Sequence, residues 1–147
     1  MQEIQGNIWD FYDQGYWCVI TTNGDRKKNG DAIMGRGIAL EAARRFPDLP
    51  RMQGQRLEYN GNKLSPFYDL HLFCFPTKWH WWEKSDLSLI AVSAFQLANY
   101  PEECYYPIKT PIYLVRPGCG NGELLWTDVR SVLERYLDHR FIVVEKV

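Results

Sequence analysis

Apolar, β-branched segments alternate along this chain with segments in which apolar residues recur at helical spacing. The strongest apolar segment is residues 16–22 (YWCVITT), whose nearly continuous apolar character is typical of a strand covered on both faces. Further strands are expected at residues 3–6, 69–75, 111–115 and 141–144, and helices at residues 38–46, 50–57, 86–98 and 128–137. This alternation predicts an α/β protein with helices on both faces of a mostly parallel sheet.

Local residue types also predict where several of these elements begin and end. Ser85 and Thr127 are expected to cap the helices that follow them, because a hydroxyl can accept from the first free backbone N–H groups. His71 is expected in the middle of a strand, which residues 76–78 (PTK) close. Residues 101–107 are expected to be a connection without regular structure.

Length and composition are those of an ordinary globular chain. With 147 residues, 46% of them hydrophobic and 24% charged, we expect one domain over residues 1–147 with a core that needs no disulfide or metal. The four cysteines, at positions 18, 74, 104 and 119, show no CxxC spacing and are expected to be reduced and mostly buried. No apolar run approaches the ~20 residues of a membrane span, and no signal-peptide pattern is present, so we expect a cytoplasmic monomer.

Polar and glycine-rich segments follow the expected strands. They are Asn23-Gly24, Gly35-Arg36-Gly37, residues 76–78 and Gly118–Gly122. Because ligands of such sheets bind at the carboxyl ends of the strands, these segments are expected to meet at one edge. Two glycine loops that each lead into a helix suit a diphosphate, since each directs backbone N–H groups at one end of it.

Several other classes of site are excluded by the absence of their motifs. The chain has no GxxxxGKS or GxxxxGKT sequence, no GxGxxG after its first strand and no GxSxG, which argues against a nucleoside triphosphatase, a standard dinucleotide fold and a serine hydrolase. The three histidines are scattered, so neither a metal site nor a cofactor is expected. The net charge of -1 provides no general attraction for nucleic acid, so any such contact has to be local.

Lys78 is the strongest candidate for chemistry. It follows a strand directly and precedes Trp79, Trp81 and Trp82, and partial desolvation there would lower its pKa and favour attack on a carbonyl-like carbon. The alternative interpretation is a surface lysine after a turn. The three tryptophans fit either a loop packed onto the domain or a wall on which flat rings stack.

These segments together resemble macro domains, which bind ADP-ribose. The resemblance covers most of the chain through QGNI (5–8), ITTN (20–23), MGRGIALEAARRFP (34–47), FPTKWHWWEKSDLSLI (75–90) and GCGNGELLWTDV (118–129). It is strongest to the DarG-type antitoxin macro domains, which remove ADP-ribose from thymidine in DNA. It extends more distantly to the terminal ADP-ribose protein glycohydrolase. The implied fold is a three-layer α/β/α sandwich around a mixed, mostly parallel central sheet.

The resemblance also implies a binding role for each matching position. Asn7 and Ile8 would contact the adenine. The diphosphate or the distal ribose would be lined by Met34, Gly35, Arg36, Gly37 and Ile38, and the second phosphate loop would comprise Pro117, Gly118, Cys119, Gly120, Asn121 and Gly122.

The same resemblance implies the residues of the chemical step. Lys78 would act on the anomeric carbon, by capture of a ring-opened aldehyde or by a related lysine-assisted cleavage, with Asn23 as a second catalytic residue beside the distal ribose. Further contacts with the substrate would come from Trp79, His80, Trp81 and Glu123.

Two departures from the related patterns bear on the substrate. The protein glycohydrolase has an acidic residue where this chain has Gly122, whereas DarG-type domains also lack it, and Glu123 follows directly. The loop at residues 24–33 is longer than in the DarG pattern, and its Arg26, Lys27 and Lys28 would supply local contacts with phosphates.

We therefore expect an ADP-ribosyl glycohydrolase that acts on thymidine-linked ADP-ribose, with ADP-ribose and ADP-ribosylated single-stranded DNA as its partners. Two alternatives remain open at this point: an ADP-ribose 1''-phosphate phosphatase that uses the same pocket, and a non-catalytic module that binds ADP-ribose or a related nucleotide. A binding module would keep its function without Lys78. The biological role, whether antitoxin, viral counter-defence or repair, is also open.

Overall fold

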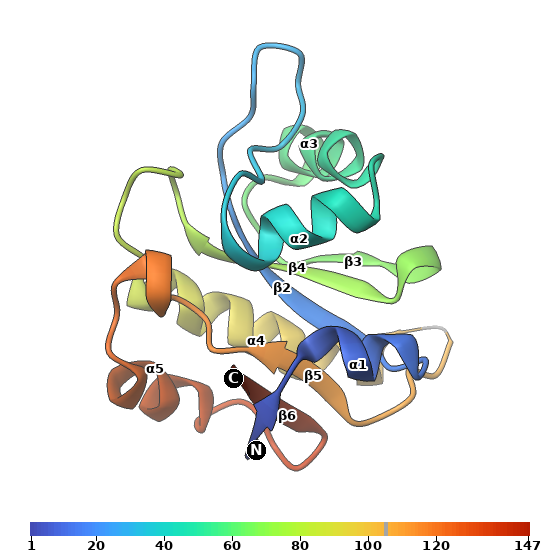
Figure 1. The fold of residues 1–147 in the computed structure, drawn as a ribbon, viewed down its shortest axis with the longest axis vertical. Helices are drawn as coiled ribbons and strands as arrows, with labels where there is room; N and C mark the ends of the chain where they lie inside the picture. Colours follow the sequence, from blue (N-terminus) through green and yellow to red (C-terminus); the bar gives the residue numbers. More distant parts are fainter. Residues whose placement is uncertain (105) are drawn as a thin grey trace.

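A six-stranded sheet forms the centre of the computed structural model, which describes residues 1–104 and 106–147. The strands lie in the order β1-β6-β5-β2-β4-β3 (Figure 1). Their bounds are Gln2–Gly6 (β1), Cys18–Asn23 (β2), Ser65–Phe67 (β3), Leu72–Lys78 (β4), Ile112–Val115 (β5) and Phe141–Lys146 (β6). The helices of the described residues are Ile8–Asp13 (α1), Gly37–Arg45 (α2), Leu49–Asn60 (α3), Leu87–Glu103 (α4) and Trp126–Leu133 (α5).

All neighbouring strands are parallel except β3, which pairs antiparallel with β4 at the edge of the sheet. This confirms the expected mixed, mostly parallel sheet. Parallel pairing brings the carboxyl ends of β1, β6, β5, β2 and β4 to the same edge, where β1, β5, β2 and β4 each lead into the next segment of the chain. That edge is where the polar and glycine-rich segments gather.

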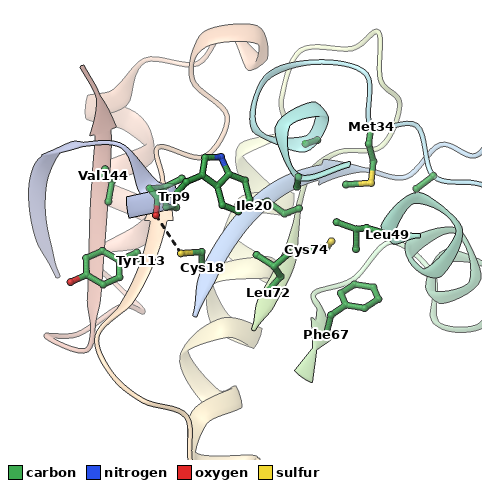
Figure 2. Close-up of a cluster of buried hydrophobic side chains, with 14 of the residues drawn as sticks. Trp9, Cys18, Ile20, Met34, Leu49, Phe67, Leu72, Cys74, Tyr113 and Val144 are labelled. Carbon is green, nitrogen blue, oxygen red and sulfur yellow. Dashed lines mark hydrogen bonds between the residues drawn. The ribbon is translucent and has the colours of Figure 1, made fainter. Parts of the chain in front are cut away.

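The helices form a layer on each face of the sheet, as the alternating pattern predicts. Helices α1, α2 and α3 cover one face and α4 and α5 cover the other (Figure 1). On the first face, Trp9 of α1 and Leu49 of α3 pack with Ile20 and Leu72 of the central strands (Figure 2). On the second face, Leu97 of α4 is fully buried with other apolar side chains of the sheet and α5.

Two cysteines belong to the first of these cores. Cys18 and Cys74 are buried (Figure 2), as their apolar surroundings in the sequence predict, and all four cysteines are free thiols. Burial raises the pKa of the Cys18 thiol to about 12, and its Sγ lies 3.8 Å from the carbonyl oxygen of Ile8, which it faces as a donor. Burial also raises the pKa of Cys74. Both thiols are therefore packing groups without nucleophilic character.

Two elements escape the sequence pattern because they are very short. Helix α1 occupies Ile8–Asp13, where only a turn is expected, and it begins because the Asn7 Oδ1 accepts from the backbone N–H of Trp9 at 3.0 Å. Strand β3 has three residues and depends on its pairing with β4.

The expected boundaries of the middle segments are wrong in four places. Asp86 caps α4 in place of Ser85, because its Oδ1 accepts from the N–H groups of residues 88 and 89 at 2.9 and 3.4 Å. Thr127 lies inside the first turn of α5, whose cap position is Leu125. His71 precedes β4 in a left-handed conformation (φ 52°), and β4 itself continues through residues 76–78.

The end of α4 also differs from the expected connection at residues 101–107. The helix continues through Pro101 to Glu103, and residue 105 lies outside the described residues. Pro101 has no N–H to donate to the carbonyl of Leu97, so this turn of the helix lacks one backbone hydrogen bond. Within the described residues, no helix has the length and apolar character needed to cross a membrane.

The two faces of α4 allow a direct test of the core. We expect Leu97→Ala, at a fully buried position, to lower the free energy of unfolding by about 2–5 kcal/mol, because it removes apolar contacts and leaves a cavity. Val92→Ala, on the exposed face of the same helix, should change it by no more than about 0.5 kcal/mol. Urea unfolding followed by circular dichroism measures both, and equal effects would contradict the assigned core.

Candidate functional site

A cavity of about 750 Å³ lies along the edge of the sheet where the parallel strands end. Residues at the carboxyl ends of β1, β6, β5, β2 and β4 all line it. Four strand spacings separate β1 from β4 in this order, a distance of about 19 Å at ~4.8 Å per spacing. The cavity is therefore elongated across the sheet and has the volume of a nucleotide-sized ligand.

Most of the residues that the sequence predicts for the site line this cavity. They are Asn7, Ile8, Asn23, Gly35, Arg36, Gly37, Ile38, Lys78, Trp81, Gly118, Cys119, Gly120, Asn121 and Gly122. They come from both ends of the chain and from its middle, so the fold brings together residues that are far apart in the sequence.

Five predicted residues lie outside the cavity lining. Met34 is buried in the core beneath α2 and α3 (Figure 2), and Pro117 is buried beside the cavity. Trp79, His80 and Glu123 are exposed at the surface next to it.

The first glycine loop presents the N-terminus of α2 to the cavity. Gly37 adopts a φ of 54°, which favours glycine, and Arg36 occupies the cap position without a side-chain capping hydrogen bond. The first N–H groups of α2 therefore have no side-chain cap. A helix N-terminus of this kind attracts an anion through its N–H groups and its dipole.

The second glycine loop faces the first. Gly118 has a φ of 75°, and a Cβ atom on it would lie 2.7 Å from the Ile90 Cδ1 atom of α4, so a larger residue would be strained and would require Ile90 to shift. The loops approach closely, because a Cβ atom at Gly37 would lie 3.5 Å from the Nδ2 atom of Asn121. Backbone groups of two loops thus surround one region of the cavity, as a diphosphate requires.

Lys78 ends β4 and connects two loops through its side chain. Its Nζ donates to the carbonyl oxygens of Trp81 and Asn121, each at 3.3 Å. Burial lowers the pKa of Lys78, the positive charge of Arg36 lowers it further, and the carboxylate of Glu123 opposes the shift. The amine is consequently easier to deprotonate than an ordinary lysine, which a nucleophilic role requires.

Asn23 and Asp25 hold the loops around Lys78 in place. The Asn23 Nδ2 donates to the Ile33 carbonyl at 3.0 Å, and its Oδ1 accepts from the N–H of Asp25 at 2.9 Å. The Asp25 carboxylate in turn accepts from the N–H of Trp81 at 2.9 Å and pairs with His80 Nδ1 at 2.8 Å. That hydrogen bond raises the pKa of His80. The loop after β2 and the loop after β4 are thereby tied together.

The opposite end of the cavity, at β1 and β6, contains charged groups that the sequence motifs do not single out. Arg116 lines the cavity after β5, and its Nη2 lies 3.2 Å from the Oε2 atom of Glu145. The guanidinium also lies 4.8 Å from the ring centroid of Trp126. Its position directly after a strand is the one sequence signal that identifies it.

Three residues with hydroxyl groups also line the cavity, although the sequence did not predict them as site residues. Thr22 and Thr77 lie near the carboxyl ends of β2 and β4, and Ser85 precedes α4. The Ser85 N–H donates to the Gly122 carbonyl of the second glycine loop at 3.0 Å. All three lie inside the matched segments ITTN and FPTKWHWWEKSDLSLI, but nothing in those segments assigns them to the site, and the sheet topology identifies them as lining residues.

The basic loop contributes less than its sequence suggests. Of Arg26, Lys27 and Lys28, Lys27 alone lines the cavity, while Arg26 pairs with Glu58 at 3.5 Å. Among the described residues, no group of three or more His, Cys, Asp or Glu side chains is placed to hold a metal ion.

Two solved structures with the same architecture are macro domains of the DarG type. The macro domain of Thermus aquaticus DarG matches with a TM-score of 0.71 and 22% identity, covering 99% of this chain and 97% of that one. The macro domain of Mycobacterium tuberculosis DarG matches with a TM-score of 0.66 and 26% identity over 86% of each chain. The chain therefore has the fold of these macro domains. No protein-family model matches it.

Within this class, its sequence is similar to proteins of the DarG type. It is 29% identical over 111 residues to the DNA ADP-ribosyl glycohydrolase of Mycobacterium tuberculosis, and 25% identical over 144 residues to that of Thermus aquaticus. The match spans 30% and 37% of those proteins. The structure of Thermosipho africanus DarTG in complex with ADP-ribose matches with a TM-score of 0.72 and 22% identity, over 99% of this chain and 41% of that one.

The close packing of the second glycine loop gives a test of its geometry. We expect Gly118→Ala to lower the free energy of unfolding by about 1–3 kcal/mol, because it adds a methyl group against Ile90 at a left-handed position. Gly35→Ala is the matched control, since a Cβ atom there meets nothing within 4 Å and its effect should stay within about 0.5 kcal/mol. Chemical unfolding measures both, and an unaffected Gly118→Ala variant would contradict the assigned packing.

Proposed function

We propose that this macro domain is an ADP-ribosyl glycohydrolase that releases ADP-ribose from thymidine in DNA. The observation that carries the proposal is Lys78, a lysine with a lowered pKa at one end of an elongated cavity lined by two glycine loops. The similarity to proteins named DNA ADP-ribosyl glycohydrolase supports the reaction, and the similarity to a structure containing ADP-ribose supports the ligand.

ADP-ribose would lie across the edge of the sheet. Its adenine would bind near Asn7 and Ile8 at the β1 end, and its diphosphate between the two glycine loops, whose backbone N–H groups attract negative charge. The distal ribose would then lie beside Asn23 and Lys78. This orientation places the anomeric carbon, and the thymine attached to it, at the β4 end of the cavity.

The hydrogen bonds of Lys78 suit a nucleophile. A neutral amine has two N–H donors and one lone pair. The two carbonyl oxygens that face Nζ, from Trp81 and Asn121, would accept both donors and leave the lone pair free for the substrate. Asn23 would act by fixing the loop that starts at Asp25, because both ends of its amide are engaged there.

The proposed reaction has two steps. The Lys78 amine forms a bond to the anomeric carbon while the bond from that carbon to thymine breaks, and the thymine leaves with the bonding electrons and takes up a proton. Water then hydrolyses the lysine adduct, which releases ADP-ribose and restores the free amine.

Removal of the amine provides the decisive test. We expect Lys78→Ala to reduce release of ADP-ribose from a thymidine-ADP-ribosylated single-stranded oligonucleotide at least about 100-fold, the scale for loss of a catalytic side chain. Its affinity for free ADP-ribose, measured by calorimetry, should change little because the glycine loops remain. Lys84→Ala, which removes an exposed lysine of the same segment, is the matched control and should behave as the wild type.

Three outcomes separate the candidate functions. Release that depends on Lys78 supports the glycohydrolase. ADP-ribose binding by the wild type without any release would contradict it and favour a binding module. Removal of phosphate from ADP-ribose 1''-phosphate, equally fast in Lys78→Ala, would favour the phosphatase.

The surroundings of Lys78 predict a pH dependence. Release should rise with pH as Lys78 loses its proton, and Glu123→Gln should move the midpoint of that rise to lower pH, because the Glu123 carboxylate raises the pKa of Lys78. Glu123 does not line the cavity, so the maximal rate should be retained. The pH–rate profiles of the two proteins check this, and a midpoint that moves upward would contradict it.

A further inference from the structure

The segment between β4 and α4 exposes three tryptophans within four consecutive residues, 79–82. Trp79, Trp81 and Trp82 are 51%, 43% and 67% exposed. We call these three residues, together with His80, the tryptophan rim. Trp9 and Trp17 are buried instead, so the exposed indoles are concentrated here. Of the two interpretations that the sequence allows, a loop packed onto the domain is therefore the one that the structure disfavours.

Acidic side chains on both sides hold the rings of Trp79 and His80 and the backbone of Trp81. The Trp79 Nε1 donates to Asp86 Oδ2 at 3.1 Å, and the Trp81 N–H and the His80 ring both bind Asp25. Rings that are held before binding lose little conformational entropy when a partner arrives, which favours recognition by shape.

One face of the rim is flat and open. The rings of His80 and Trp82 are parallel, with an interplanar angle of 4° and a centroid separation of 5.6 Å, so they form an offset stack. Trp82 is the most exposed of the three indoles and does not line the cavity. It therefore has surface available to a ring that lies outside the pocket.

The rim is continuous with the β4 end of the cavity. It starts directly after Lys78, Trp81 lines the cavity, and the Trp81 carbonyl accepts from the Lys78 amine. In the orientation proposed above, the thymine and the DNA strand attached to it emerge at this end. The groups next to the modified nucleotide must then pass the rim.

The charges around the rim do not favour a purely electrostatic contact. Arg36, Lys78 and Lys84 are offset by acidic residues in and beside the segment: Asp25, Glu83, Asp86 and Glu123. A binder that relied on phosphates would need an excess of cations. Stacking on aromatic rings provides affinity for single strands without that excess, since every base has a flat face.

We propose that the tryptophan rim binds the single-stranded DNA on either side of the modified thymidine, with a neighbouring base stacked on Trp82. This inference rests on the proposed function, because it takes the DNA-linked substrate as the occupant of the site. It adds a second point of recognition beyond ADP-ribose, through which the domain would bind a modified strand more tightly than a modified nucleoside.

Two substrates of different length test the rim. We expect Trp82→Ala to raise the KM for a thymidine-ADP-ribosylated decanucleotide about 5- to 150-fold, the range for loss of one stacked base. Its kcat, and its KM for ADP-ribosyl-thymidine without flanking nucleotides, should stay at the wild-type values. Trp82→Phe should restore much of the affinity because it keeps a flat ring.

Tyr59→Ala provides the matched control, since Tyr59 is an 81% exposed aromatic residue of α3 outside the rim, and both KM values should be unchanged. Equal KM values for the decanucleotide in Trp82→Ala and the wild type would overturn the inference. So would an effect on an ADP-ribosylated peptide that matched or exceeded the effect on the decanucleotide.

A failure of the proposed function remains distinguishable. If the wild type releases ADP-ribose from neither substrate, the glycohydrolase activity is rejected. Binding of the labelled decanucleotide, measured by fluorescence anisotropy, then tests the tryptophan rim by itself. Weaker binding of the decanucleotide by Trp82→Ala, with unchanged affinity for free ADP-ribose, supports the rim. Unchanged binding of both overturns it.

Discussion

The parallel pairing of β2 with both β4 and β5 is the constraint on which the site depends. Strand β2 is central and buried on both faces, so its register with its neighbours is fixed by packing. Because all strands from β1 to β4 in the sheet order run the same way, the segments that follow β1, β5, β2 and β4 leave the sheet at one edge. The cavity is a direct result, since neighbouring strands end together while their loops diverge.

Side-chain hydrogen bonds then join these loops into one structure. Asp25 connects the loop after β2 to the segment after β4, and Lys78 connects that segment to the second glycine loop. The residues that would act on a substrate are thus also the residues that hold the walls of the cavity together. A pocket built in this way is formed before the ligand arrives, which lowers the entropic cost of binding.

Much of this arrangement follows from the sequence, because the glycine loops and Lys78 are local signals and the strands have a strong apolar pattern. Helix α1 and strand β3 could not be predicted from the sequence. With six and three residues, respectively, they show too little periodicity, and their stability comes from packing and from strand pairing. Arg116 and Ser85 were missed because their importance depends on which loops meet in space. Asp86, and not the predicted Ser85, caps α4, because its carboxylate lies where it accepts from the first free N–H groups of the helix. The sequence alone does not specify which of two neighbouring polar residues takes this position.

The paired carbonyl contacts of Lys78 have a consequence for the order of events in a reaction cycle. A free neutral amine has N–H groups for both Trp81 and Asn121, whereas a lysine nitrogen bonded to the anomeric carbon has only one when it is neutral. Once the nitrogen of the proposed adduct loses its proton, one of the two carbonyls would lose its donor, and one of the two loops would be released. Chemistry and the mobility of one cavity wall would then be coupled through a single nitrogen atom.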